Sequence, residues 1–170
     1  MKNLNLIYYI FICSLSSTIN AQDKDRYNLQ YTFAKFEIRD GRKNGDDITP
    51  ILLQEKACLL MYKTSDSEQI MLSNFWEESN SQSYGPIYFI SKEENPNKEG
   101  NYKNDLFHFY WSYINTYDKK EGTAMVNLLI VQKPLGNYFE LTILPENLDK
   151  LEYQGKLMSD YLVLDFNMKK

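Results

Sequence analysis

The residues that most often carry chemistry in proteins are scarce in this sequence. It contains a single histidine, His108, and two cysteines, Cys13 and Cys58. A tetrahedral zinc site takes three or four histidine, cysteine or carboxylate ligands, so these residues do not supply the usual sets. No serine lies in a G-x-S-x-G motif, and no glycine-rich phosphate loop is present. We therefore expect no catalytic residues, no metal site and no cofactor.

Carboxylate chemistry is the one catalytic route that the composition leaves open. A glycan-cleaving enzyme needs only two aspartate or glutamate side chains at a suitable separation. Glu77 and Glu78 are adjacent, as are Glu93 and Glu94. Neighbouring residues in a strand usually point apart, so we interpret both pairs as solvated surface charge. A carboxylate-dependent enzyme acting on glycans stays an alternative, while a protein without catalytic machinery is favoured.

Aromatic residues are the positive feature, with 14 tyrosines, 9 phenylalanines and 2 tryptophans. They concentrate in Leu106–Tyr117. One face of a strand there would carry Leu106, His108, Tyr110 and Ile114, and the other Phe107, Phe109, Trp111, Tyr113 and Tyr117. A sheet face this aromatic must be covered by a second layer, a ligand or a partner. We interpret both faces as core, with a binding surface for a sugar, lipid or protein as the functional alternative.

The candidate ligand-binding residues are Trp76, Tyr84, His108, Tyr110 and Tyr113. Tyrosine and tryptophan suit a site that is apolar in body and polar at the tip. Trp76 ends an expected strand and meets a polar loop, and binding residues concentrate on loops at the rim of a β scaffold. Trp111, flanked by aromatic residues, is expected to be structural instead. His108 is expected to be packed and hydrogen-bonded rather than a catalytic base.

The first 21 residues have the pattern of a secretory signal peptide. Lys2 supplies the positive end, Leu4–Ile12 the short apolar core, and Ala21 the small residue at the cleavage point. The apolar run is too short for a membrane anchor, which needs about 20 apolar residues. Lipoprotein processing at Cys13 would want a small preceding residue, and Ile12 is not small. The sequence predicts a secreted or periplasmic protein with no membrane span after cleavage.

Residues 22–170 have the length of one domain, long enough to bury roughly 70% of the unfolded surface. The whole chain has a formal net charge of −4, and loss of the single basic residue in the signal segment makes the remainder one unit more acidic. A mildly acidic chain without a basic cluster argues against nucleic acid as a partner. Cys58, in the apolar run Ala57–Met61, is expected to be a buried thiol.

Hydrophobic alternation predicts a series of short strands. The central pair is Leu106–Tyr117 and residues 123–131, joined by the polar loop DKKEG, which is typical of a hairpin. Further strands are expected at Tyr27–Arg39, Ala57–Lys63, Gln69–Trp76, Ile87–Lys92, Tyr138–Leu144, Lys150–Gln154 and Tyr161–Phe166. The alternation in the first of these changes phase near Ala34 and Lys35, which predicts a β-bulge.

Loops are expected at Asp40–Asp47, at Glu77–Gly85 and at Glu93–Asp105, the last of them mobile. Pro86 lacks an N–H to donate, so it would begin the strand that follows. Thr49 and Pro50 fit an N-cap and a first helical residue, which leaves a short helix near Pro50–Lys56 open.

About eight short strands, close in sequence, predict an all-β domain over residues 22–170. A lipocalin-like antiparallel barrel and a two-sheet sandwich both fit this pattern. We expect an exported, non-catalytic binding or interaction protein with an aromatic-rich scaffold, whose partner is a small ligand, a glycan or a protein. The alternatives are the glycan-active enzyme and a subunit of a cell-surface assembly, in which the aromatic face meets another chain.

Overall fold

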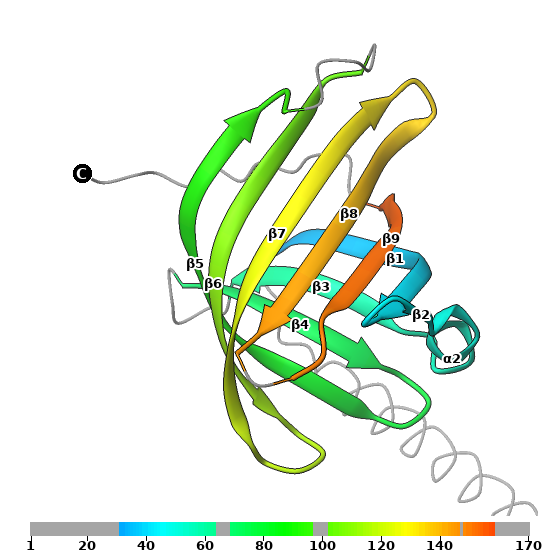
Figure 1. Ribbon diagram of the computed structural model, residues 1–170, viewed down its shortest axis with the longest axis vertical. Coiled ribbons are helices and arrows are strands. Elements are labelled where there is room, and N and C mark those ends of the chain that lie inside the picture. Colours follow the sequence, from blue (N-terminus) through cyan, green and yellow to red (C-terminus); the bar gives the residue numbers. More distant parts are fainter. Residues whose placement is uncertain (1–30, 64–68, 97–101, 147, 159–170) are drawn as a thin grey trace, which may run out of the picture.

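The computed structural model of the chain describes residues 31–63, 69–96, 102–146 and 148–158. Within them, one antiparallel sheet has the strand order β2-β1-β3-β4-β5-β6-β7-β8-β9 (Figure 1). β1 also pairs with β9, so the sheet closes into an eight-stranded barrel with β2 attached to β1 outside the ring. The predicted all-β fold is confirmed, and the closure selects the barrel over the sandwich.

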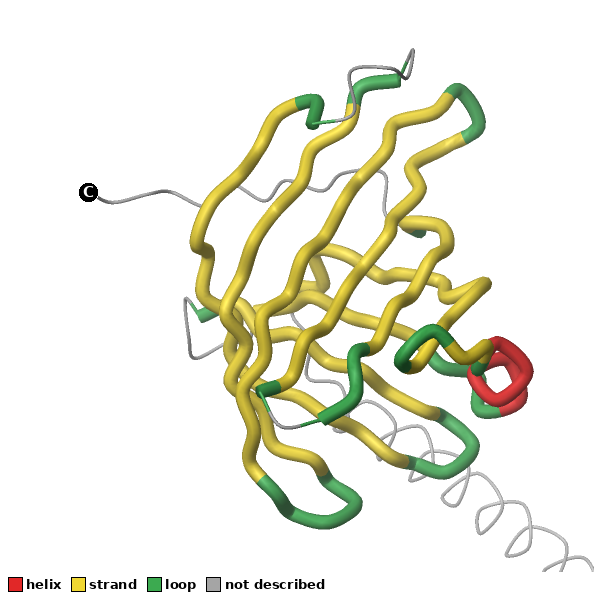
Figure 2. Tube along the Cα trace, in the orientation of Figure 1, coloured by secondary structure: helices red, strands yellow, loops and turns green. Residues whose placement is uncertain are grey.

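Short connections join strands that are neighbours in the barrel. The strands are β1 (Tyr31–Lys43), β2 (Asp46–Asp47), β3 (Cys58–Lys63), β4 (Ile70–Trp76), β5 (Ser81–Glu94), β6 (Asn104–Asn115), β7 (Glu121–Lys133), β8 (Gly136–Pro145) and β9 (Leu151–Leu157). One short helix, α2 (Thr49–Gln54), lies between β2 and β3. Figure 2 shows α2 beside one end of the barrel. Antiparallel neighbours need only such short turns, which is why an up-and-down order follows from the sequence.

The predicted central hairpin is the pair β6–β7, in which Phe109 lies opposite Val126 and Trp111 opposite Ala124. Phe109 and Trp111 face the interior and are 0% and 2% exposed, whereas Tyr110 faces outward and is 37% exposed. The aromatic run is therefore buried on one face only, and the expectation of a two-sided core is wrong. A barrel has one interior, so alternate residues of each strand must face outward. Tyr117 belongs to neither face of β6, because the strand ends before it, at Asn115.

β1 continues to Lys43, beyond the predicted end at Arg39, because both of its edges find partners. It pairs with β3 along its first half and with β9 along its second. The register shifts between Thr32 and Ala34, next to the predicted bulge, and again between Ile38 and Asp40. The predicted loop at Asp40–Asp47 is wrong in extent, since the pairing with β9 continues the strand to Lys43. The turn contains only residues 44 and 45, with φ angles of 52° and 94°, as expected for a tight hairpin.

The short helix predicted near Pro50–Lys56 is present one residue earlier, and Thr49 is not its N-cap. Ile48 holds the cap position. The hydroxyl of Thr49 instead accepts a hydrogen bond from the N–H of Gly41 at 3.0 Å. A Cβ atom at Gly41 would lie 2.2 Å from Cδ1 of Leu52, so the glycine lets that buried leucine pack α2 against β1.

The predicted loop at Glu77–Gly85 is mostly strand. Only residues 77–80 form a turn, and β5 begins at Ser81. Pro86 lies inside β5, opposite Met71, and not at the strand start. Propensity misses this segment because Ser81 and Ser83 are polar, yet they pair with β4. β5 also extends to Glu94 and β6 begins at Asn104, so the third predicted loop is shorter than expected.

Several predictions fall outside the described residues. They concern the signal segment 1–21, the start of the strand Tyr27–Arg39, the strand Tyr161–Phe166 and the centre of the loop Glu93–Asp105. Over the described ranges, no helix has the length and apolar character that crossing a membrane would take. Cys58 is half-buried at the start of β3, and is thus more exposed than the buried thiol expected from the sequence.

The two ends of the barrel interior differ. Where β6 begins, Phe36 and Phe139 meet edge to face with ring centroids 5.0 Å apart, and Phe107 stacks on Phe109 at 6.3 Å. These four side chains are 0–6% exposed. We call this the filled end. We call the other half, where β4 and β6 end, the hollow end.

Candidate functional site

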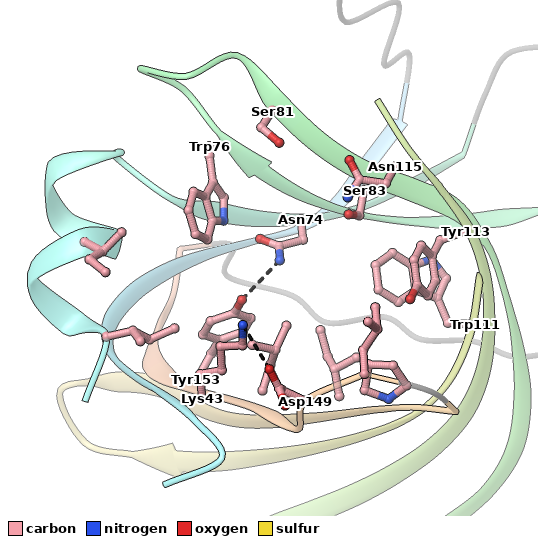
Figure 3. Close-up of a pocket in the computed structure, with 16 residues that line it drawn as sticks. Lys43, Asn74, Trp76, Ser81, Ser83, Trp111, Tyr113, Asn115, Asp149 and Tyr153 are labelled. Carbon is pink, nitrogen blue, oxygen red and sulfur yellow. Dashed lines mark hydrogen bonds and ion pairs between the residues drawn. The ribbon is translucent and has the colours of Figure 1, made fainter. Parts of the chain in front are cut away.

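A cavity of about 480 Å³ opens at the hollow end (Figure 3). Its size lies within the range of pockets that hold small molecules. Residues of β1, β4, β5, β6, β8 and β9 contribute to its lining, together with α2 and the connection between β8 and β9. The barrel thus gathers at one place residues that are far apart in the sequence.

Small polar residues at interior positions make room for the cavity. Ser81 and Ser83 of β5 line it. Further along the same strand, and on its neighbour β6, the interior positions of the filled end carry Ile87, Phe107 and Phe109, which are 2%, 6% and 0% exposed. A serine side chain fills far less space than a phenylalanine side chain. The same strands therefore pack the interior at one end of the barrel and leave a cavity at the other.

Aromatic side chains form two facing walls of the cavity. Trp111 and Tyr113 of β6 lie on one side, with ring centroids 4.5 Å apart, and Trp76 of β4 lies on the other (Figure 3). The indole Nε1 of Trp111 donates to the carbonyl oxygen of Gly85 at 3.2 Å. A Cβ atom at Gly85 would lie 2.0 Å from the carbonyl oxygen of Ser112, so a glycine is needed where β5 and β6 approach so closely.

A buried polar pair lies between these walls. Nδ2 of Asn74 donates to the hydroxyl oxygen of Tyr153 at 3.1 Å, and the two residues are 9% and 1% exposed. Burial raises the pKa of Tyr153 to about 12, although the hydrogen bond from Asn74 acts in the opposite direction. The hydroxyl therefore keeps its proton at neutral pH. Among the described residues, none donates to Oδ1 of Asn74, whereas buried acceptors usually have a partner.

An ion pair lies at the rim. Nζ of Lys43 is 3.0 Å from Oδ2 of Asp149. The hydrogen bonds from Lys43 and Asn44, with the charge of Lys43, hold the pKa of Asp149 below its usual range. The side chain of Asn44 also accepts from the N–H of Lys150 at 2.8 Å, which ties the β1–β2 turn to the start of β9. Lys43 and Asp149 are the charged residues among the described lining, so the cavity wall carries no net charge.

Helix α2 forms one edge of the mouth. Ile51 lines the cavity and is 50% exposed. Glu55, just after the helix, holds it to the β4–β5 turn: its carbonyl oxygen accepts from the N–H of Glu77 at 2.8 Å, and its carboxylate from the N–H of Ser79 at 2.9 Å. These contacts fix the position of the helix against the strands that carry the aromatic and serine walls.

The structure brings together two of the five predicted site residues. Trp76 and Tyr113 both line the cavity. Trp111, expected to be mainly structural, is buried as predicted, and it also contributes to the lining. The chain contains only these two tryptophans, so both lie at the site.

The other three predicted site residues lie on the outer face of the barrel. Tyr84 alternates with the inward-facing serines of β5, and Tyr110 alternates with the inward-facing aromatic residues of β6. The ring nitrogens of His108 lie 2.8 Å from Oδ1 of Asn127 and 3.3 Å from Oε1 of Glu93. None of the three lines the cavity.

Sequence reasoning missed the polar half of the lining, which consists of Asn74, Ser81, Ser83, Asn115 and Tyr153. One signal was available. Asn74 lies in the same phase as Leu72 and Trp76, so an interior strand position carries an amide among apolar neighbours. The serines and Tyr153 gave no comparable signal, because their strands were predicted as loop or as a short segment.

The described lining is suited to binding. It holds serines but neither histidine nor cysteine, and its single carboxylate is Asp149. Across the described residues, no group of three or more histidine, cysteine, aspartate or glutamate side chains is placed to hold a metal ion. Aromatic walls with a few fixed polar groups are what a small-molecule site uses to hold and orient its ligand.

Comparison of the chain with protein-family models, with curated proteins and with solved structures found no match.

Proposed function

We propose that this protein is an exported, non-catalytic binding protein that holds a small ligand in the hollow end of its barrel. The observation that carries the proposal is the cavity of about 480 Å³, with its aromatic walls and buried polar pair. Pockets of this size and composition commonly hold small molecules. The pattern of residues 1–21 supports export.

The glycan-active enzyme receives less support. Glycoside hydrolysis takes two carboxyl groups on either side of the scissile bond, one of them with a raised pKa. The described lining offers one carboxylate, and the pKa of Asp149 is lowered by Lys43 and Asn44. The adjacent pairs Glu77–Glu78 and Glu93–Glu94 do not line the cavity.

A dye titration tests the binding function. N-phenyl-1-naphthylamine is uncharged, and its emission rises in apolar surroundings. Because Trp76 and Trp111 both line the cavity, dye bound there lies within the range of energy transfer from tryptophan. We expect a saturable rise in dye emission on excitation of tryptophan.

A matched pair of variants locates the bound dye. Ser83→Phe places a ring inside the cavity, whereas Thr142→Phe places the same ring on the outer face of β8, between the inward-facing Leu141 and Ile143. We expect Ser83→Phe to weaken dye binding about tenfold or more, because the ring occupies ligand space, and Thr142→Phe to leave it unchanged. Equal affinities for the two variants would show that the dye binds elsewhere.

The outer face favours a second candidate, a subunit that assembles with a second copy of this chain. Tyr88, Tyr110, Met125 and Leu144 are direct cross-strand neighbours from β5 to β8 and are 47%, 37%, 39% and 39% exposed. The row is uncharged along its length, so it can meet an identical row across a two-fold axis. Sedimentation of the protein and of Tyr110→Ser tests this: a dimer that the substitution dissociates supports assembly, and a monomeric wild type excludes it.

A further inference from the structure

The buried pair Asn74–Tyr153 points to a particular kind of ligand. We propose that the hollow end selects an uncharged ligand whose apolar ring body carries a group that both donates and accepts a hydrogen bond, an amide or a hydroxyl, and that Asn74 and Tyr153 recognise this group. The inference rests on the proposed binding function and specifies the chemistry of its ligand.

The hydrogen-bonding capacity of the pair leaves one donor and one acceptor free. An asparagine amide has an acceptor oxygen and an NH₂ donor, and a tyrosine hydroxyl can donate once while it accepts. Nδ2 of Asn74 donates to the oxygen of Tyr153 at 3.1 Å, which leaves Oδ1 of Asn74 to accept and the O–H of Tyr153 to donate. Rotation of the amide by 180° would exchange these roles but would again leave a donor beside an acceptor.

Packing alone does not explain this pair. Asn74 is 9% exposed and lines the cavity, and no described residue donates to its Oδ1. A buried acceptor without a donor lowers stability, whereas a leucine of similar volume would avoid that cost. Sites that bind a ligand often retain such unfavourable groups because the ligand satisfies them.

The surroundings disfavour an anionic head group. A carboxylate ligand would place its oxygens against Oδ1 of Asn74 and would lose its hydration in the cavity. The one lysine in the described lining, Lys43, is already paired with Asp149 at the rim. The facing walls of Trp76 and Trp111 suit a flat or ring-shaped apolar body.

Four naphthalene probes that differ only in the head group test the proposal by displacing N-phenyl-1-naphthylamine at pH 7. 2-Naphthamide and 2-naphthol carry a donor and an acceptor, 2-methylnaphthalene carries neither, and 2-naphthoate is an anion without a donor. We expect the amide or the alcohol to displace the dye at about tenfold lower concentration than the methyl compound and the carboxylate. The better of these two probes identifies the head group as an amide or as a hydroxyl.

Two substitutions then assign the preference to the pair. Tyr153→Phe removes only the hydroxyl, and Asn74→Leu removes the amide at similar volume. We expect either variant to lose the preference for the amide or alcohol over the methyl compound, measured as the ratio of their displacing concentrations on that same variant. Thr142→Val removes a hydroxyl from the outer face of β8, away from the lining, and should keep the preference. Circular dichroism confirms folding, and Tyr153→Phe is sufficient for the test if Asn74→Leu does not fold.

The outcomes separate the two proposals. If the dye binds and all four probes compete equally, or the carboxylate competes best, the head-group inference is overturned while the binding function stands. The same holds if both variants keep the wild-type preference. If neither the dye nor any probe binds to the wild type, the binding function fails and the inference fails with it.

Discussion

The filled and hollow ends of the barrel are built from the same strands, but these strands contribute core residues to one end and cavity-lining residues to the other. β6 contributes Phe107 and Phe109 to the filled end and Tyr113 and Asn115 to the hollow end. β4 contributes Leu72, 0% exposed, to the core, and two residues later Asn74 to the cavity. The barrel topology is common to both ends, so it does not decide which of them binds. The size and polarity of the interior side chains do.

The interactions at the two ends differ in kind as well. The filled end is held by apolar contact, with aromatic rings meeting edge to face or stacked. The hollow end uses hydrogen bonds between distant strands, from Asn74 to Tyr153 and from Trp111 to Gly85. Apolar packing stabilises without specifying partners, whereas fixed polar groups orient a ligand. We therefore expect substitutions at the filled end to affect stability alone, and those at the hollow end to affect binding as well as stability.

Phe109→Ala should have the largest effect on stability. Phe109 is 0% exposed at the filled end, so truncation leaves a void that the closed barrel cannot collapse. We expect the free energy of unfolding to fall by about 3–5 kcal/mol, and Trp111→Ala, which empties a site 2% exposed, to cost a similar amount. Denaturant unfolding followed by circular dichroism measures both. A loss below about 1 kcal/mol for Phe109→Ala would mean that the filled end is not the core.

Tyr153 should make stability fall at high pH. Its pKa is raised from the ordinary 10.0 to about 12, so the folded state holds the proton more tightly than the unfolded state does. The stabilisation is therefore complete below pH 10 and is lost as the pH rises from 10 to 12, by about 2–3 kcal/mol. Unfolding measured across this interval should show a smaller fall for Tyr153→Phe than for the wild type. Parallel curves for the two proteins would contradict the proposed burial of this hydroxyl.

Trp76→Ala should cost clearly less stability than Phe109→Ala. Trp76 is half-buried at the mouth of the hollow end, where one side faces the cavity. We expect about 1 kcal/mol in denaturant unfolding, with a marked loss of dye binding. If Trp76→Ala proves the more destabilising of the two, the division of the barrel into a filled and a hollow end is wrong.

For Cys58 we predict a difference in thiol reactivity between the native and the unfolded protein. It is half-buried at the start of β3, and desolvation raises the pKa of its thiol. Less thiolate is present at pH 8 than in the unfolded chain, so we expect slower labelling by 5,5′-dithiobis(2-nitrobenzoate) in the native protein, with a rate that increases above pH 9. Equal rates for the native and denatured protein would contradict this shielding.

Strand alternation allowed part of the site to be predicted. It placed Tyr110 and His108 on the face opposite Phe107 and Phe109, as the structure has them. It did not say which of the two faces is interior, because both carry large side chains that a core could bury. The candidate site residues therefore include His108 and Tyr110 together with Tyr113. In the structure the first two face outward, whereas Tyr113 lines the cavity.

The polar half of the site could not be predicted from local sequence patterns. Asn74 and Tyr153 are separated by 79 positions, and only closure of the barrel brings them to 3.1 Å. Ser81 and Ser83 look like loop residues in isolation, and their strand character comes from pairing with β4. Such pairing outweighs β-propensity, which depends on the neighbours that a strand acquires.

The sequence by itself determined the all-β class, the hairpin of β6 and β7 and the alternation within each strand, because these depend on residues close together in the chain. The tertiary structure decided the closure of β1 on β9, where Phe36 lies opposite Leu157, and with it the direction of the interior. It also determined where the cavity lies and how large it is, since six strands and a helix contribute the side chains that surround it. Local patterns fix which residues share a face, but the space between faces exists only once the barrel has closed.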